Sequence, residues 1–216
     1  MTITLATIQA ELLAERALYL PALHAVVCSD VHLGKTSTFR HHGLAVPDGP
    51  HITDLQRLDA LVRRPGSASC AQLIVVGDLV HARHNHEWER FAAVRATWDN
   101  AVTLVSGNHD HHAMAFAQRA GIAVTPFLEL GSMAFVHSPE DAHHGPDITI
   151  CGHLHPAVVL HGRARQKLRL PCFWHRGSIF VLPAFGSFTG SMTITPQHGD
   201  RVWAIAADAV HAVHQT

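Results

Sequence analysis

Leu73-Ile74-Val75-Val76-Gly77-Asp78 is an uninterrupted apolar run that ends in a glycine and a carboxylate. A continuous apolar run of this length is typical of a strand that is covered on both faces. Val102-Thr103-Leu104-Val105 repeats the pattern, and His24-Ala25-Val26-Val27-Cys28 is a weaker example. Helical patterns lie between these runs, so the first half of the chain is predicted to form a parallel sheet in which strands and helices alternate.

Three helices are expected around the predicted strands. Thr53 can cap the first, and Pro65-Gly66 would end it. The other two are expected at about residues 87–98 and 111–120. After Gly152, short β-prone runs separated by glycine and proline predict a mainly antiparallel second sheet. The fold class is therefore α/β, with two sheets face to face and helices outside.

Length and composition limit the architecture. With 216 residues, 47% of them hydrophobic, the chain can build one core, so we expect a single domain over residues 1–216 without an insertion for a capping domain. The first 20 residues fit either an amphipathic helix or edge strands. No apolar stretch reaches the length of a membrane span and the N-terminus lacks a signal-peptide pattern, which favours a cytoplasmic protein without a membrane partner. The four scattered cysteines are expected to be buried free thiols.

Metal-binding side chains follow apolar or strand-like runs in five places. These segments are Asp30-Val31-His32, Gly77-Asp78, Gly107-Asn108-His109-Asp110, His137 and Gly152-His153-Leu154-His155. Because ligands on the ends of neighbouring strands converge, we expect one binuclear metal site. The alternative, unrelated polar strand ends in an inert domain, leaves the agreement of order, spacing and ligand type unexplained. The 16 histidines outside these segments are interpreted as solvent-exposed.

The donors divide between two ions. Asp30 and His32 are two residues apart, so on an extended strand end both point to the same face. Asp78 has two oxygens and can bridge two ions. One ion is expected to bind Asp30, His32, Asp78 and His155, and the other Asp78, Asn108, His137 and His153. Mixed oxygen and nitrogen donors without thiolate favour Mn, Fe or Zn over Mg or Ca.

Such a site suits the hydrolysis of a phosphoester. Two divalent ions, two aspartates and a bridging hydroxide leave about one net positive charge with which to hold a phosphate, and the ions offset charge on the attacking and leaving oxygens of an in-line displacement. His109, next to Asn108, can protonate the leaving oxygen. Asp110 can orient or charge-stabilise the His109 imidazole.

The motifs D-x-H, G-D, G-N-H-D, a single histidine and G-H-x-H, in this order, resemble those of the calcineurin-like metallophosphoesterase superfamily. They span about residues 24–155. The resemblance implies a four-layer α/β/β/α sandwich of two mixed sheets with flanking helices, a metal-bridging hydroxide as nucleophile, the ligands named above and His109 as catalytic acid. Many members carry an aspartate three residues after the bridging one, where this chain has His81.

Four further segments resemble the ligase-associated DNA damage response phosphoesterases, which are small bacterial proteins. They are Ser29-Asp30-Val31-His32-Leu33-Gly34-Lys35, Gly77-Asp78-Leu79-Val80-His81, Leu170-Pro171-Cys172-Phe173-Trp174 and Leu182-Pro183-Ala184-Phe185-Gly186-Ser187-Phe188-Thr189-Gly190. This resemblance implies a Mn-dependent phosphodiesterase or endonuclease that acts on single- or double-stranded DNA in repair, linked to an ATP-dependent DNA ligase and a helicase. Two alternatives stay open: a hydrolase of small phosphoesters, such as cyclic nucleotides or nucleotide-sugar lipids, and a non-catalytic metal-bearing scaffold in a repair complex.

A basic stretch follows the last metal motif. Its alternating residues would share one face of a strand and form a ridge able to track a phosphate backbone; they are Arg163, Arg165, Lys167 and Arg169. Phe173 or Trp174 would offer a stacking surface, and Lys35 can contact a substrate phosphate. The alternatives are an ordinary exposed strand, core aromatics and a solvated helix face. The net charge of -1 gives no global argument for nucleic-acid binding.

Overall fold

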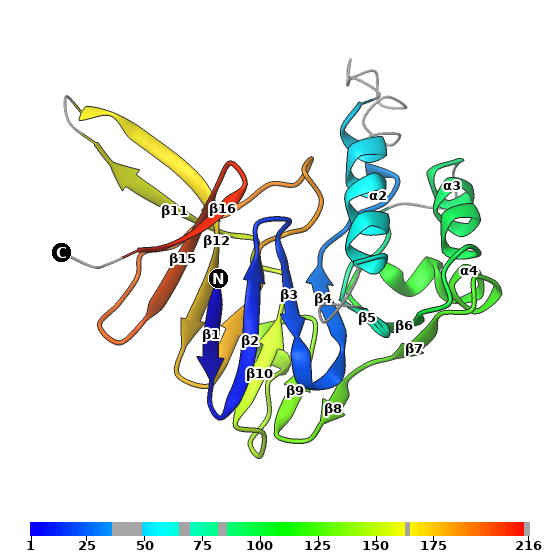
Figure 1. Cartoon of the computed structure of the whole chain (residues 1–216), viewed down its shortest axis with the longest axis horizontal. Helices are drawn as coiled ribbons and strands as arrows, with labels where there is room; N and C mark the ends of the chain where they lie inside the picture. Colours follow the sequence, from blue (N-terminus) through cyan, green and yellow to red (C-terminus); the bar gives the residue numbers. More distant parts are fainter. Residues whose placement is uncertain (36–48, 65–69, 82–85, 163–164, 214–216) are drawn as a thin grey trace.

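Two β-sheets lie face to face in the computed structural model, which describes residues 1–35, 49–64, 70–81, 86–162 and 165–213 (Figure 1). The first sheet has the strand order β1-β2-β3-β4-β5-β6-β7. Its strands are β1 (Thr2–Leu5), β2 (Ile8–Leu13), β3 (Ala17–Leu20), β4 (Ala25–Ser29), β5 (Gln72–Val76), β6 (Ala101–Val105) and β7 (Ala123–Thr125). β1 to β4 pair antiparallel, and β4 to β7 pair parallel. The predicted parallel sheet is confirmed, and the first 20 residues form strands rather than a helix, with β1 at the edge of the sheet.

The second sheet begins before Gly152. Its strands are β8 (Leu128–Leu130), β9 (Met133–Phe135), β10 (Ile148–Cys151), β11 (Pro156–His161), β12 (Lys167–Arg176), β13 (Ile179–Val181), β14 (Met192–Thr193), β15 (Arg201–Ala206) and β16 (Ala209–Val213). β9, β10 and β13 are parallel neighbours at its centre, while most outer pairs are antiparallel. The sheet is therefore mixed, and its start was missed because β8 and β9 are short and turn at Gly131, which has φ 63°.

Three α-helices of the described residues cover the outer face of the first sheet (Figure 1). They are α2 (Gly49–Val62), α3 (His86–Arg95) and α4 (Met114–Arg119), and the short 3₁₀ segments are η1 (Pro21–Leu23), η3 (Asp110–His112) and η4 (Pro139–Asp141). α2 starts before Thr53, so the predicted capping residue lies inside the helix. The third predicted helix is split into η3 and α4, and Gly121 (φ 67°) follows it as expected.

The sheets bury both of their faces, which explains the continuous apolar runs. In β4, Val27 faces the second sheet, while Val26 and Cys28 face the helices. The layer between the sheets also contains Phe135 and Phe180. Successive side chains of each central strand point to opposite faces of the sheet, so each strand contributes both to the core between the sheets and to the core under the helices.

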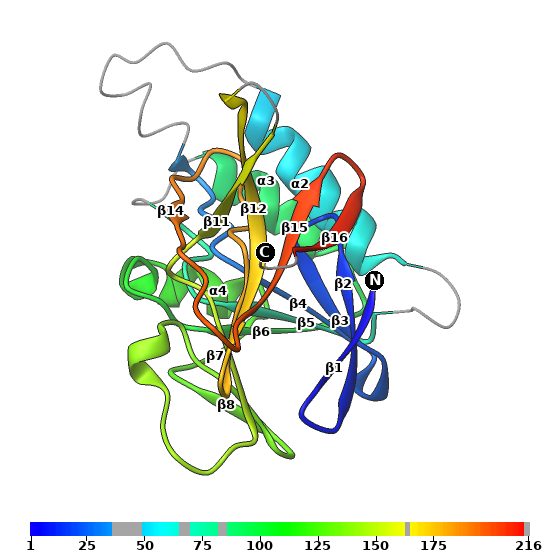
Figure 2. The same cartoon turned by 90° about the vertical axis from the view of Figure 1, so that its left-hand side faces the viewer.

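A helical layer was expected on the outer face of the second sheet, but strands cover this face instead. Val136, Cys151 and Val181 on this face pack with Val158 of β11 and Ile194. In Figure 2, β11, β12, β15 and β16 face the viewer, and α2 and α3 lie behind them. Within the described residues, this side is closed by strands and a loop rather than by an α-helix, because the long β12 bends from β11 to β13 and β15.

The four cysteines are buried free thiols, as predicted. Burial raises the pKa of each of them, which keeps them protonated. None of the helices within the described ranges combines the length and hydrophobicity that a membrane span requires.

Candidate metal centre

The predicted ligands lie where the central strands of both sheets end. Asp30 follows β4, Asp78 follows β5 after Gly77, and Asn108 follows β6 in an exposed loop. His137 follows β9, and His153 and His155 follow β10. An isolated parallel bridge between Ser29 and Ala184 joins the two sheets at this edge. Ligands that are far apart in sequence are therefore brought together by the strand order.

Most of these ligands have left-handed backbone conformations. The φ angles are 53° for Asp30, 53° for His32, 47° for Asp78, 68° for His153 and 48° for His155. This conformation costs a residue with a side chain about 1–2 kcal/mol relative to the right-handed region. Because such strain persists where the surrounding structure imposes it, its concentration here indicates a functional site.

The donor atoms form two overlapping groups. Donor atoms of Asp30, His32 and His155 lie within 4.8 Å of one another, and so do those of Asp30, Asp78 and His137. His155 Nε2 is 3.2 Å from Asp30 Oδ1, and His137 Nε2 is 3.7 Å from Asp78 Oδ2. Asp30 is common to both groups. Asp78, to which the sequence interpretation gave the shared role, also lies near both, because its Oδ2 is 3.9 Å from His32 Nε2 and 3.7 Å from His137 Nε2.

Several of these atoms are buried without a hydrogen-bond partner among the described residues. They are Asp30 Oδ1, both ring nitrogens of His32, His137 Nδ1 and His155 Nε2. Although His155 Nε2 lies near Asp30 Oδ1, the pair lacks hydrogen-bond geometry. Each buried polar atom without a partner costs about 1–3 kcal/mol. A divalent cation would satisfy carboxylate oxygens and neutral imidazole nitrogens together, so the residues present fit a metal centre.

Three glycines leave room for the ligands. A Cβ atom on Gly77 would lie 1.8 Å from His137 Nδ1, and one on Gly107 would lie 2.4 Å from Asp78 Oδ1. At Gly152 it would lie 2.4 Å from Asp30 Oδ2. Any side chain at these positions would collide with a candidate ligand. The glycines of the G-D, G-N-H-D and G-H-x-H motifs are therefore required by packing.

Backbone N–H and C=O groups form hydrogen bonds that orient the candidate ligands. The His153 N–H donates to Asp30 Oδ2 at 3.0 Å, and the His109 N–H donates to Asp78 Oδ1 at 3.0 Å. His155 Nδ1 lies 2.9 Å from the Gly190 carbonyl oxygen. Because a carbonyl oxygen can only accept, Nδ1 carries the hydrogen, and Nε2 presents its lone pair toward Asp30.

Burial keeps two of the imidazoles neutral. It lowers the pKa of His32 to about 2, with further lowering by Lys35 and neighbouring histidines, and it also lowers the pKa of His137. For His155, burial lowers the pKa, but the neighbouring Asp30 carboxylate more than offsets this, so the pKa is raised overall. Neutral imidazole is the form that binds a metal.

His109 and Asp110 have different environments. The His109 side chain is 46% exposed, and its Nε2 lies 4.0 Å from Asp78 Oδ2. Asp110 is buried and accepts hydrogen bonds from the backbone N–H groups of Gly107, at 2.8 Å, and Val80, at 3.3 Å. Burial raises its pKa to about 6. The predicted contact between Asp110 and the His109 ring is not found in the part of the chain that is described; Asp110 joins two ligand loops instead.

His81 was noted in the sequence without a role. Its ring centroid lies 5.2 Å from that of His32 and 4.9 Å from that of His109. Burial, followed by the charge of Lys35, lowers its pKa to about 4. His81 thus completes a cluster of histidine rings at the open side of the centre.

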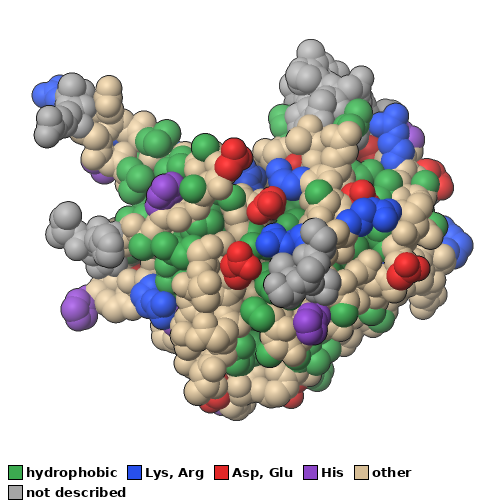
Figure 3. Space-filling view, in the orientation of Figure 1, with side chains coloured by type: hydrophobic (Ala, Val, Ile, Leu, Met, Phe, Trp, Pro, Cys, Tyr) green, Lys and Arg blue, Asp and Glu red, His purple; other side chains and the backbone are tan. Residues whose placement is uncertain are grey.

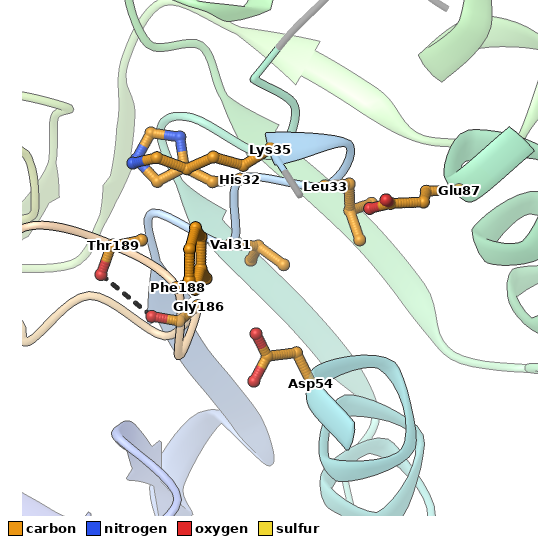
Figure 4. Close-up of a pocket in the computed structure, with 9 residues that line it drawn as sticks. All are labelled: Val31, His32, Leu33, Lys35, Asp54, Glu87, Gly186, Phe188 and Thr189. Atoms are coloured by element: carbon orange, nitrogen blue, oxygen red, sulfur yellow. Dashed lines mark hydrogen bonds between the residues drawn. The ribbon is translucent and has the colours of Figure 1, made fainter. Parts of the chain in front are cut away.

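The loop after β13 contributes residues that no motif predicted. The Gly186 N–H donates to the Asp30 carbonyl oxygen at 3.1 Å, and the Thr189 hydroxyl donates to the Gly186 carbonyl oxygen at 2.9 Å. Figure 4 shows Lys35 extending alongside the His32 ring, with Phe188 near them. Lys35, Gly186, Phe188 and Thr189 line a small cavity together with the candidate ligand His32. Only the Pro-Ala-Phe-Gly-Ser-Phe-Thr-Gly stretch used for the narrower resemblance signalled this loop.

The predicted basic ridge is shorter than expected. Arg163 lies outside the described residues. Arg165 has a left-handed backbone (φ 60°) in the turn before β12, which begins at Lys167. Since this turn breaks the extended alternation, only Lys167 and Arg169 share a strand face.

The predicted stacking surface is also wrong. Phe173 is fully buried between the sheets, and Trp174 is 9% exposed, with its indole N–H bonded to Asp200. Both aromatics belong to the core, because β12 turns inward where it meets β13 and β15.

Known proteins resemble this chain in sequence and structure. Residues 23–140 match the calcineurin-like phosphoesterase family. The crystal structure of Pseudomonas putida nuclease MPE is 34% identical, with 99% of each chain covered and a TM-score of 0.81. A protein of unknown function from Aquifex aeolicus is 16% identical over 61% of this chain and 78% of its own (TM-score 0.43). A predicted phosphoesterase from Streptococcus pneumoniae is 17% identical over 84% and 82% (TM-score 0.31). The last two superpose too poorly to support an inference, and no curated protein matches significantly.

Proposed function

Because the chain belongs to the calcineurin-like phosphoesterase family, and is thus a metal-dependent phosphoesterase, we propose that it is a phosphodiesterase that cleaves DNA. The observation that carries this proposal is the likeness to a nuclease over 99% of both chains. The donor set supports it, because Asp30, His32, Asp78, His137 and His155 converge from separate strand ends.

The proposed ligands are those expected from the sequence. They are Asp30, His32, Asp78, Asn108, His137, His153 and His155. Two divalent ions held there would activate water and offset the charge of the phosphate. The mixture of carboxylate and imidazole donors suits Mn, Fe or Zn, and the sequence resemblance leads us to propose Mn among them.

We assign His109 as the acid that delivers a proton to the leaving oxygen. The His109 ring is partly exposed, whereas the His32 and His137 rings are buried. A partly exposed imidazole next to the ligand loops can both reach a substrate and exchange its proton with solvent. Asp110 would act indirectly, by holding the loop that carries His109.

The place of this activity in bacterial DNA repair, beside an ATP-dependent DNA ligase and a helicase, is part of the proposal and rests on the sequence resemblance. Lys35, Lys167 and Arg169 are proposed contacts for DNA phosphates. The first lies half-buried beside His32, and the other two are exposed on β12.

The test compares four substrates with the same enzyme. Bis-p-nitrophenyl phosphate, p-nitrophenyl phosphate, linear DNA and closed circular single-stranded DNA would each be incubated with Mn, Mg or Zn. We expect the diester and both DNAs to be cleaved, with Mn most effective, and the circle to show endonuclease activity. Asp78→Asn protein, purified identically, excludes a contaminating nuclease. Hydrolysis of the monoester or small diester without cleavage of any DNA would contradict the proposal.

A further inference from the structure

A second cavity, of about 140 Å³, adjoins the candidate ligand His155. It lies between the β11–β12 hairpin and the loop after β13. Two arginines and three hydroxyl residues contribute to its lining: Arg16, Arg169, Ser187, Thr189 and Ser191. No aspartate or glutamate is among the residues that line it. By contrast, basic and acidic side chains are intermixed near the centre of the face seen in Figure 3.

Both arginines are held by backbone carbonyl groups. Arg16 donates to the carbonyl oxygens of Ala184 at 3.4 Å and Gly186 at 3.3 Å, and Arg169 donates to that of Ser191. A carbonyl partner fixes a guanidinium group but does not neutralise it. Since a guanidinium has five N–H donors, both groups retain donors for a further ligand.

The charge of these arginines is not balanced by an ion pair. Among the described residues, neither has a carboxylate within 4.0 Å, whereas Arg57 pairs with Asp54 at 3.1 Å. Burial and the neighbouring Arg57 lower the pKa of Arg16, and the charge of Asp54 offsets only part of this lowering. An anion in the cavity would add negative charge beside both guanidinium groups.

The wall of the cavity is already fixed in place. Asp54 accepts hydrogen bonds from the backbone N–H of Ser187, at 2.8 Å, and from its hydroxyl, at 3.0 Å. The Gly190 carbonyl on the same loop orients His155. A preorganised wall lowers the entropic cost of binding.

We propose that this cavity binds the phosphate one nucleotide away from the scissile phosphate. The inference rests on the proposed function, because it assumes a nucleotide at the metal centre. Arginine is well suited to a phosphate, which it can bind through two parallel N–H donors. Because His155 belongs to both the cavity and the centre, one strand can occupy both with consecutive phosphates.

The test uses nucleoside p-nitrophenyl esters with and without a second phosphate. Thymidine 3′-(p-nitrophenyl phosphate) is compared with its 5′-phosphorylated form, and thymidine 5′-(p-nitrophenyl phosphate) with its 3′-phosphorylated form. We expect the wild-type enzyme to show a KM about 5–20-fold lower for the phosphorylated member of one pair. Arg169→Gln should abolish that preference, and Arg169→Lys should keep only part of it, because lysine retains the charge but not the two parallel N–H donors.

Arg119→Gln on α4 is the matched control, because it removes the same charge from an exposed residue outside the cavity and should keep the preference. The KM ratio is taken within each variant, so a general loss of activity cancels. Equal KM values within both wild-type pairs, or an unchanged ratio in Arg169→Gln, would overturn the subsite while leaving DNA cleavage intact. Turnover of bis-p-nitrophenyl phosphate alone, without DNA or nucleoside esters, would overturn the proposed function and the subsite together.

Discussion

Two regions of the molecule contain carboxylate side chains with little exposed surface, but the two regions satisfy these carboxylates differently. Asp200, whose side chain is 3% exposed, accepts two hydrogen bonds from Arg176 and one each from the Trp174 indole and the Gln197 N–H. Asp30 is fully buried, yet one of its oxygens has no hydrogen-bond partner among the described residues. Asp78, 5% exposed, has three histidine nitrogens at 3.7–4.0 Å from one oxygen.

This difference indicates that Asp200 has a structural role, whereas Asp30 and Asp78 are available to bind a ligand. Arg176 is the main reason that the pKa of Asp200 falls to about 2, so the charged form of Asp200 stabilises the fold. A buried charge without full compensation destabilises the fold, unless a bound cation compensates it. The candidate metal centre is thus organised for a cation, a charge that the described residues around it do not supply.

The largest expected effect is at the centre. Asp78→Asn should lower kcat for bis-p-nitrophenyl phosphate by at least about 10³-fold, because the neutral amide cannot hold two cations together. Metal content measured by mass spectrometry should fall by at least one ion. Asp200→Asn, the matched control, should keep its metal and most of its kcat. Two bound ions and near-normal turnover in Asp78→Asn would show that this carboxylate is not shared.

His109→Ala should separate proton transfer from metal binding. Both ions should remain, and kcat should fall by about 10²–10⁴-fold for an alkyl diester. The loss should shrink for p-nitrophenyl esters, since nitrophenolate leaves with little need for a proton. An equal loss for both leaving groups would indicate that His109 positions the substrate only.

Stability without metal tests the comparison directly. In EDTA, Asp200→Asn should lower the free energy of unfolding by about 2–3 kcal/mol, because it breaks hydrogen bonds to a charged group. Asp30→Asn should leave it unchanged or raise it, since it removes an uncompensated charge and asparagine tolerates the left-handed backbone. Urea denaturation gives both values. A similar loss in the two variants would refute the distinction drawn between the two regions.

The contribution of Asp200 should also depend on pH. Its pKa is about 2 in the folded protein and 3.8 ordinarily, so its ion pair stabilises fully above about pH 4. The stabilisation should disappear as the pH falls from about 4 to 2. The difference in unfolding free energy between the wild type and Asp200→Asn should therefore be constant from pH 5 to 7 and smaller at pH 3. A constant difference down to pH 3 would mean that Asp200 is not held in its charged form.

The smallest effect is expected on DNA binding, when the exposed, solvated charge of Lys167 is removed. Lys167→Gln is expected to weaken DNA binding only several-fold at low salt and to reduce the slope of log Kd against log salt by about one. Turnover of bis-p-nitrophenyl phosphate should not change. Anisotropy titrations at several salt concentrations, with Arg119→Gln as the charge-matched control, measure the slope. If both variants have the same slope, Lys167 does not contact DNA.

The central strands and the positions of the ligands could be predicted because each is encoded locally. Leu73-Ile74-Val75-Val76 is wholly apolar, which predicts a strand that is buried on both faces, and the polar residues after it mark the end of the strand. The first 20 residues were ambiguous, since their short apolar runs fit two periodicities. Nothing local to Arg165 signals the left-handed turn that shortens the basic ridge.

Sequence patterns could not predict contacts between residues that are far apart in the sequence. The carbonyl of Gly190 orients His155 from 35 residues away. Arg16 reaches the loop after β13 across about three quarters of the chain. Asp110 is adjacent to His109, yet it bonds to the backbone of another loop. A pattern shows which chemistry a residue offers, but the fold decides which partner receives it.

The left-handed backbone of the ligands has an evolutionary consequence. At Asp78, with φ 47°, glycine would be the relaxed residue and every other side chain is a compromise. Selection for stability alone would therefore drift toward glycine at such positions and erase the donors. Asp78→Gly should be more stable than Asp78→Ala by about 1 kcal/mol in EDTA. That difference would measure how far selection has held this position away from its conformational optimum.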